Sequence, residues 1–196
     1  MSSWGAVEGS EALPKFLTTA QKKDVYANQS GWVVEAGSTM TGNGNTSADP
    51  EILVAIGGLA GASGTTGLGE ATINTVDWNI TTFDKSAGGT LSVTVRYNET
   101  VTVAVSNPTI IVTNDTNSNH TLTYASGTGT HELTFTLVIA AANAATDADD
   151  VLSVAAQSIV LASSSTIKDT SDTPANAELA ISAGQGTACG TIIATA

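Results

Sequence analysis

Apolar and small polar residues alternate along the segment from about Thr90 to Ile181. The alternating positions are Leu91, Val93, Val95 and Tyr97, then Val101, Val103 and Val105, then Leu133, Phe135, Leu137 and Ile139. A period of two places alternate side chains on opposite faces of a β-strand, so each run has one buried and one solvated face. Clusters of Gly, Asn, Asp and Ser separate the runs, as is typical of antiparallel sandwiches. The pattern predicts an all-β fold with an antiparallel β-sandwich over residues 70–184.

The composition agrees with a β-rich, tightly turned protein. Of the 196 residues, 41% are hydrophobic but only 12% are charged, about half of the ~25% that is usual in soluble domains. Thr and Val favour strands, while Gly and Asn favour turns. The formal net charge is −12, and nucleic-acid binding needs basic side chains to neutralise phosphates. We therefore expect no nucleic-acid partner, and we attribute the acidity to solubility, with an electropositive partner surface as the alternative.

Cysteine usage and the N-terminal sequence bear on the compartment. Cys189 is the one cysteine, so no intramolecular disulfide can form, and this favours a reducing cytoplasm. The start, MSSWGAVEGSEALPKF, lacks a basic region followed by an apolar run, and no apolar stretch approaches the ~20 residues of a membrane span. We expect a soluble protein made inside a cell, without a membrane partner.

Residues 1–60 differ from the rest and are predicted to form an extended N-terminal arm. The run from Thr18 to Tyr26 could form one short helix, with Thr18 or Thr19 as its N-cap. Short strands are predicted at residues 31–36 and 51–56. The Gly-rich segment 57–69 is predicted to be a flexible connector at the domain boundary.

The arm also carries large apolar side chains in a polar context. Such a segment cannot bury them alone, so we expect it to dock onto another surface, its own or a neighbour's. The predicted anchors are Trp4, Leu13, Phe16, Tyr26 and Trp32.

The C-terminal segment, residues 185–196, is predicted to contain one further strand. We place this strand at residues 187–194 and expect it to pair back on the strands of the arm, because neither group is long enough to be stable alone.

Residues with potential chemistry do not form a recognised catalytic pattern. His120 and His131 flank a predicted hairpin and are expected in surface loops, without a third metal ligand at a defined spacing. Asp147, Asp149 and Asp150 are a calcium candidate, with a solvated turn as the alternative. The glycines match neither GxxxxGK[ST] nor GxGxxG, and no basic residue neighbours Cys189. We expect a non-enzymatic protein without a cofactor.

Several segments carry a family resemblance. The runs LSVTVRYNETVTV, NPTIIVT, TLTYASGTGTHELTFTLVI, ADDVLSV and IVLASSSTIKDT resemble a bacterial and phage immunoglobulin-like domain family over residues 88–181. The sequence departs from that family at residues 140–145, AAANAA. The N-terminal segments WGAVEGSEALPKFLT, VYANQSGWVVEAG and PEILVAIGGL resemble the openings of small structural proteins of tailed phages, particularly those of marine cyanobacteria.

The resemblance implies an immunoglobulin-like sandwich within a virion protein. It implies a capsid decoration, or cement, protein that lies on the capsid exterior, is assembled in the host cytoplasm and stabilises the shell. The implied partners are the major capsid protein and further copies of the chain itself. Two alternatives stay open: a component of the phage tail, neck or fibre, and an adhesive immunoglobulin-like module of a bacterial surface.

Overall fold

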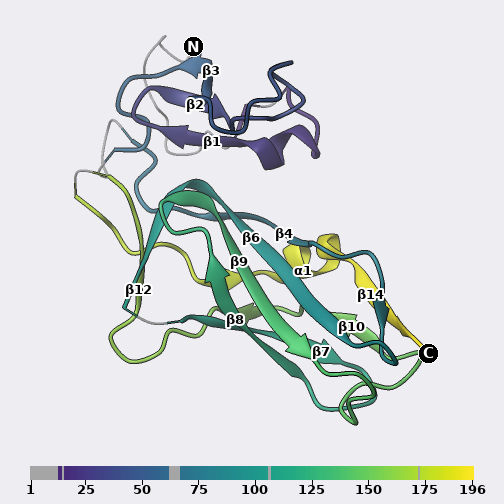
Figure 1. The fold of residues 1–196 in the computed structure, drawn as a ribbon. Helices are drawn as coiled ribbons and strands as arrows, with labels where there is room; N and C mark the ends of the chain where they lie inside the picture. Colours follow the sequence, from purple (N-terminus) through teal and green to yellow (C-terminus); the bar gives the residue numbers. More distant parts are fainter. Residues whose placement is uncertain (1–12, 15, 62–66, 106, 172) are drawn as a thin grey trace.

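The chain folds around two separate hydrophobic cores (Figure 1). The computed structural model describes residues 13–14, 16–61, 67–105, 107–171 and 173–196. We call the described residues from 13 to 68 the N-terminal module and those from 71 to 196 the sandwich module. In Figure 1 the three strands of the N-terminal module lie above the long strands of the sandwich module.

The N-terminal module is a small antiparallel sheet preceded by a 3-10 helix. Its elements are η1 (Gln21–Asp24), β1 (Val25–Asn28), β2 (Gly31–Val34) and β3 (Glu51–Ala55). β2 pairs antiparallel with both β1 and β3. Thr18 and Gln21 exchange hydrogen bonds before η1, with the Gln21 side chain accepting from the Thr18 amide at 2.9 Å. The expected short helix is therefore one 3-10 turn, and Tyr26 lies in β1 instead.

The core of this module includes part of the segment expected to be a flexible connector. Amides of that segment donate to the β1–β2 turn: Gly58 N to Gln29 O at 2.8 Å and Ala60 N to Asn28 O at 3.2 Å. The interpretation of residues 57–69 as a connector is thus wrong at its start, because the turn fixes the backbone. The buried members of the core are Leu13, Leu17, Val25, Ala27, Trp32, Val34, Leu59 and Ala60.

Gly31 explains why β3 can lie so close to the β1–β2 turn. Its φ is +134°, and a Cβ atom at this position would lie 2.1 Å from the Val54 carbonyl oxygen. A glycine is required there by both the backbone conformation and the space.

The sandwich module contains eleven strands and one helix among its described residues. They are β4 (Ile73–Trp78), β5 (Phe83–Asp84), β6 (Gly89–Ala104), β7 (Thr109–Asn114), β8 (His120–Ser126), β9 (Thr130–Ile139), β10 (Val151–Ser153), β11 (Gln157–Ser158), β12 (Thr166–Asp169), β13 (Ala180–Ile181), α1 (Ala183–Cys189) and β14 (Thr191–Thr195). Among the residues described, no helix is long and apolar enough to cross a membrane.

Most strands belong to one hydrogen-bonded sheet, in the order β3-β2-β1-β6-β9-β8-β7-β10-β14-β5. β4 and β12 also pair with β6, while β11 and β13 form a separate small sheet. Residues from β4, β6, β7, β9, β10 and β14 all pack in one core cluster. A sheet whose distant strands share one core must fold over itself, so the module is sandwich-like. The predicted all-β class is confirmed.

The alternating runs pack as the period of two predicts. Leu91, Val93, Val95, Tyr97 and Val101 are fully buried in β6, and β6 pairs antiparallel with β9. The alternation is broken at the irregularity of β6, where Asn98 and Glu99 are also buried, and at the end of the run. β6 ends at Ala104, and Val105 is exposed with a positive φ of 73°.

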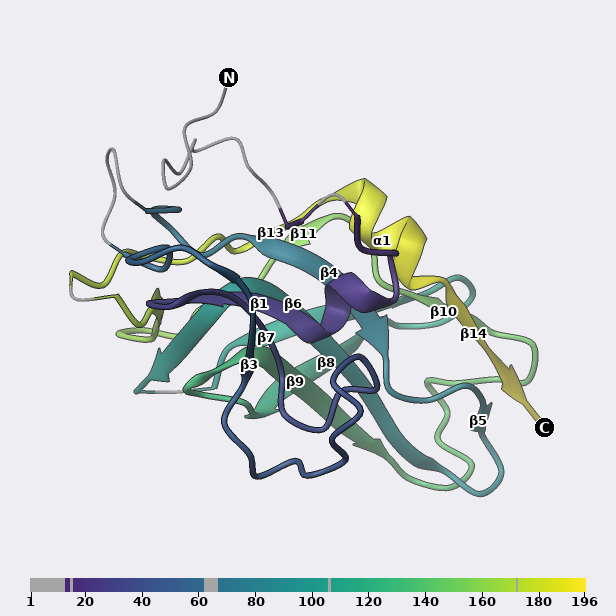
Figure 2. The same ribbon diagram turned by 90° about the horizontal axis from the view of Figure 1, so that it is seen from above.

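The C-terminal strand does not return to the N-terminal module. β14 pairs antiparallel with β10 and parallel with β5. Ile192 and Ala194 are buried in the core of the sandwich module. The predicted pairing with residues 31–36 or 51–56 is therefore wrong, since the apolar face of β14 is covered within its own module. The predicted strand also began too early, because residues 183–189 form α1, which packs against β4 (Figure 2).

The two modules meet at an irregularity in β6. Arg96 is opposite Glu132 and Val101 is opposite Thr130, so residues 97–100 of β6 face His131 of β9. Such a bulge bends the strand and interrupts its regular pairing. There β6 accepts β1 as a parallel neighbour, with Ala27 opposite Glu99.

Candidate functional site

A cluster of titratable side chains lies where the two modules meet. Glu35 immediately follows β2 of the N-terminal module, while His131 and Glu132 belong to β9 of the sandwich module. The bulge of β6 opposite His131 leaves room for the N-terminal module to approach. The site is therefore built by tertiary packing between segments about a hundred residues apart.

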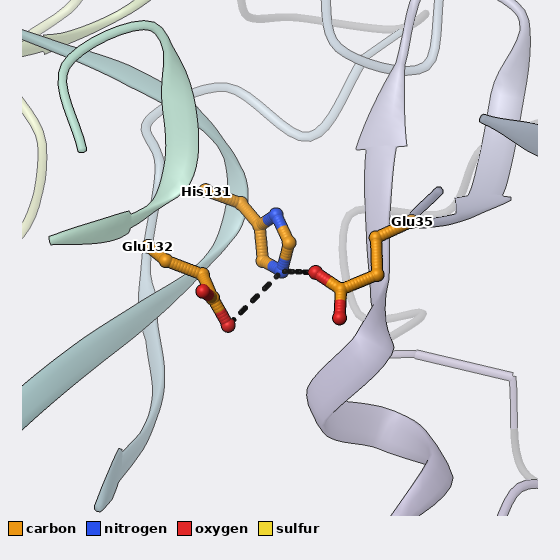
Figure 3. A group of neighbouring side chains, drawn as sticks. All are labelled: Glu35, His131 and Glu132. Carbon is orange, nitrogen blue, oxygen red and sulfur yellow. Dashed lines mark ion pairs between the residues drawn. The ribbon is translucent and has the colours of Figure 1, made fainter. Parts of the chain in front are cut away.

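The imidazole of His131 lies between two carboxylates (Figure 3). Its Nε2 is 3.6 Å from Oε2 of Glu35 and 4.0 Å from Oε1 of Glu132. One ligand atom from each residue lies within 4.8 Å of the others, which makes this trio a candidate metal-binding group among the described residues. Imidazole nitrogen and carboxylate oxygen are typical ligands of divalent transition metals.

The His131 ring is held in place by the N-terminal module. Tyr26 of β1 stacks on it with ring centroids 4.3 Å apart and planes inclined by 13°. His131 Nε2 also lies 3.3 Å from the backbone oxygen of Lys23. Both contacts cross from one module to the other, so the ring orientation depends on their docking.

An ion-pair chain continues from this cluster. Arg96 Nε donates to Glu132 Oε1 at 2.5 Å, and Arg96 Nη1 donates to Asp77 Oδ2 at 2.7 Å. Asp77 Oδ1 also accepts from Lys23 Nζ of the N-terminal module at 2.5 Å. Although burial acts to raise the pKa of Asp77, these cationic partners hold it below its ordinary value.

The carboxylates outnumber the cations at this junction. Lys23 and Arg96 face Asp77 and Glu132, and Glu35 adds a further negative charge. Burial, together with repulsion from Glu132 and Asp24, raises the pKa of Glu35 to about 7, against the opposing effect of Arg96. Burial also lowers the pKa of His131, so its imidazole is neutral at neutral pH. The site thus combines a neutral imidazole with an uncompensated carboxyl group.

The cluster borders an open pocket of about 250 Å³. Besides the three residues of the trio, its lining includes Tyr26, Thr46, Thr100 and Thr130. Solvent, and with it a small ion, can therefore reach the carboxylates, while His131 as a whole residue is 3% exposed.

A second buried carboxyl group lies at the same junction. Glu99 is 1% exposed, and its Oε1 has no hydrogen-bond partner among the described residues. Burial and the nearby Asp169 raise the pKa of Glu99 to about 8. Glu99 is therefore mainly protonated at neutral pH, which lowers the cost of burying it.

The predicted arm anchors divide into three groups. Leu13, Tyr26 and Trp32 are buried by the chain itself, so their apolar side chains stabilise the N-terminal module and its docking. Phe16 is 70% exposed. Trp4 lies outside the described residues. Of the described anchors, only Phe16 has an exposed side chain, and its role in attachment stays a prediction.

Both histidines are buried, so their predicted placement in surface loops is wrong. His120 Nε2 lies 3.1 Å from the hydroxyl of the buried Thr146. His131 packs as described above. The alternating pattern could have predicted the burial of His131, because this residue lies an even number of positions before the inward residues Leu133 and Phe135.

The calcium candidates are not gathered into a site. Asp147 pairs with Lys85 at 3.3 Å, and Asp149 is exposed. Asp150 is buried and organises the loop instead: burial acts to raise its pKa, but donated hydrogen bonds hold it well below the ordinary value. Its donors are the Thr116 hydroxyl, the Asn114 and Asn117 amides and the backbone amide of Asp147. These contacts hold the turn in place, and calcium binding there stays untested.

Cys189 is at the end of α1 rather than in the expected strand. It is partly buried against the core of the sandwich module. Burial and the charge of Asp77 raise the pKa of its thiol to about 11. Because a thiolate is the reactive form, this thiol is a poor nucleophile at neutral pH.

In comparisons with protein-family models, curated proteins and solved structures, nothing matches this chain.

Proposed function

We propose that the protein is a non-enzymatic virion structural protein, a capsid decoration protein. Its N-terminal module attaches to the capsid lattice, and its sandwich module, an immunoglobulin-like domain, projects outward. The resemblance of residues 88–181 to immunoglobulin-like domains and of the N-terminal segments to tailed-phage proteins supports this proposal. The partners are the major capsid protein and neighbouring copies of the chain. A partner that binds only the assembled shell stabilises it by mass action.

One observation carries the proposal: the N-terminal module has its own core yet still exposes apolar groups. Phe16 is 70% exposed and Ile52 of β3 is 57% exposed. β3 is also the terminal strand of the sheet, and no strand among the described residues pairs with its outer edge. An exposed apolar side chain beside an open strand edge is suited to protein–protein contact.

A matched pair of substitutions tests attachment through this module. Phe16→Asp places a charge on the N-terminal module, while Val138→Asp places one at a similarly exposed position, 76%, on β9. Co-sedimentation with phage heads that lack the protein should show wild-type binding for Val138→Asp. For Phe16→Asp we expect a loss of roughly tenfold or more, since burial of one large apolar side chain contributes about 1.5–3 kcal/mol.

Equal binding by the two variants would refute attachment through Phe16. A mass-spectrometric copy number per purified particle tests the location separately. A number comparable to that of the major capsid protein supports decoration, and a number far below it indicates a tail, neck or fibre component. Absence from purified particles would contradict a virion role.

A further inference from the structure

We propose that Glu35, His131 and Glu132 form a zinc site that ties the N-terminal module to the sandwich module. One ligand comes from the segment after β2 and two come from β9 (Figure 3). The proposal concerns how the two modules are held together and does not depend on a capsid role.

The geometry is close to that of a zinc coordination shell. With Zn–N and Zn–O distances near 2.0–2.2 Å, adjacent ligand atoms of a tetrahedral site lie about 3.3 Å apart. The separation between His131 Nε2 and Glu35 Oε2 is 3.6 Å, and that to Glu132 Oε1 is 4.0 Å. Small rotations of the two glutamate side chains bring all three atoms within reach of one ion.

The remaining contacts of the trio are compatible with an ion. Oε1 of Glu132 accepts one hydrogen bond, from Arg96 Nε, and a carboxylate oxygen keeps a second lone pair with which it can bind a cation. The Lys23 carbonyl oxygen accepts a long hydrogen bond from His131 Nε2 at 3.3 Å. Zn²⁺ at Nε2 would replace this bond and leave the ring proton on Nδ1. The adjoining open pocket supplies water as the fourth ligand, as in zinc sites with three protein ligands.

The charge distribution favours a divalent cation over an empty cluster. Glu35 is half-buried near Glu132 and Asp24, and Arg96 and Lys23 are already paired with Glu132 and Asp77. A bound Zn²⁺ offsets the repulsion between the neighbouring carboxylates of Glu35 and Glu132. The donor set contains one nitrogen and two carboxylates, fewer oxygens than the six to eight that Ca²⁺ takes.

Metal titration of the full chain tests the site. Isothermal titration calorimetry at pH 7.5 with ZnCl₂ should give one ion per chain, and saturating Zn²⁺ should raise the Tm by a few degrees. Hydrogen exchange should slow at β1 and β2 together with the start of β9, because the ion links them. Co²⁺ should give the intense visible bands of four-coordinate cobalt, while Ca²⁺ and Mg²⁺ should leave the Tm unchanged.

Two conservative variants and two controls separate this site from other binding. Glu35→Gln and Glu132→Gln preserve side-chain shape but remove the charge of a ligand. Each should weaken Zn²⁺ binding more than tenfold, because substitution of residues that only hydrogen-bond to metal ligands already lowers metal affinity about 10–100-fold. Glu51→Gln changes the same charge at an exposed position of β3 and should bind as the wild type does. Cys189→Ser removes the thiol and should also keep the site.

Several results would overturn the proposal. One is a wild-type chain that neither binds Zn²⁺ nor gains Tm at a large excess. Another is unchanged Zn²⁺ affinity in both Glu35→Gln and Glu132→Gln. Loss of binding in Cys189→Ser would place the ion elsewhere and would equally reject this assignment.

Discussion

The two modules of this chain are both β-structure, yet they reach stability differently. The sandwich module has the sixteen-residue β6 and the ten-residue β9, and many of its core side chains are fully buried. The strands of the N-terminal module have four or five residues, and its core draws on Leu59 and Ala60 from outside the sheet. Because short isolated sheets are marginal in water, we infer that the N-terminal module depends on its docking to β6.

The junction differs in kind from both interiors. Each core is mainly apolar, whereas the contact between modules includes the stacked Tyr26 and His131, the ion pairs of Arg96 and two carboxyl groups with raised pKa values. Apolar packing is insensitive to pH and ions, but charged contacts respond to both. We therefore expect docking of the two modules to respond to pH and salt more strongly than the packing of either core does.

The largest effect is expected from the core of the sandwich module. Phe135→Ala removes a fully buried ring that packs edge-on against Tyr124. We expect the free energy of unfolding to fall by about 3–5 kcal/mol, measured by urea denaturation followed by circular dichroism. The N-terminal module should unfold at the same urea concentration, since its docking strand is lost. A loss below about 1 kcal/mol would contradict a tightly packed core.

Trp32→Ala tests whether the modules unfold separately. Trp32 is 4% exposed in the N-terminal core, and we expect a local loss of about 3 kcal/mol. Hydrogen exchange measured by mass spectrometry should accelerate in β1–β3 while residues 91–95 of β6 and 133–137 of β9 keep their protection. Equal acceleration in both regions would show one cooperative unit and end the distinction drawn above.

Glu99→Gln isolates the pH dependence of the junction. The pKa of Glu99 is raised from 4.5 to about 8, so the folded state binds the proton more tightly than the unfolded state does. Its contribution to stability is full below pH 4.5 and is lost as the pH rises through 8. Between pH 7 and pH 9 the free energy of unfolding of the wild type should therefore fall by about 1.4 kcal/mol relative to that of the variant, as measured by urea denaturation.

The same comparison has a built-in control. Glu51 is exposed on β3, and Glu51→Gln should follow the wild-type curve. Glu35 has a pKa of about 7 and shapes the curve below that pH, which is why the range above pH 7 reports on Glu99. Parallel curves for Glu99→Gln and the wild type between pH 7 and 9 would show that Glu99 ionises normally.

The smallest effect is expected at the rim of the junction. Lys23→Met removes the ion pair between Lys23 and Asp77, two side chains that are partly exposed. The free energy of unfolding should fall by about 0.5 kcal/mol at low salt and by less at high salt. Lys22→Met changes the neighbouring lysine of η1 and serves as the control. A salt-independent loss, measured by urea denaturation at two ionic strengths, would indicate lost packing of the lysine stem instead.

The alternation made the large strands predictable from the sequence, because a period of two over β6 and β9 determines which side chains are buried. It could not determine the partner of β14, since a five-residue strand fits several edges and only the assembled core selects one. The Glu35–His131–Glu132 cluster was missed for a related reason: Glu35 reaches it only through docking of the modules. A histidine at an inward position of an alternating strand was the available signal.

The bulged strand β6 also has a mechanical consequence. The backbone pairing between the two modules is limited to Ala27 of β1 opposite Glu99 of β6. From Gly89 to Arg96, β6 is hydrogen-bonded along its length to β9, so tension along the strand is shared by many bonds loaded in shear. The single β1–β6 backbone pair has no such sharing. We therefore expect a mechanical load to detach the N-terminal module before the sandwich module unfolds.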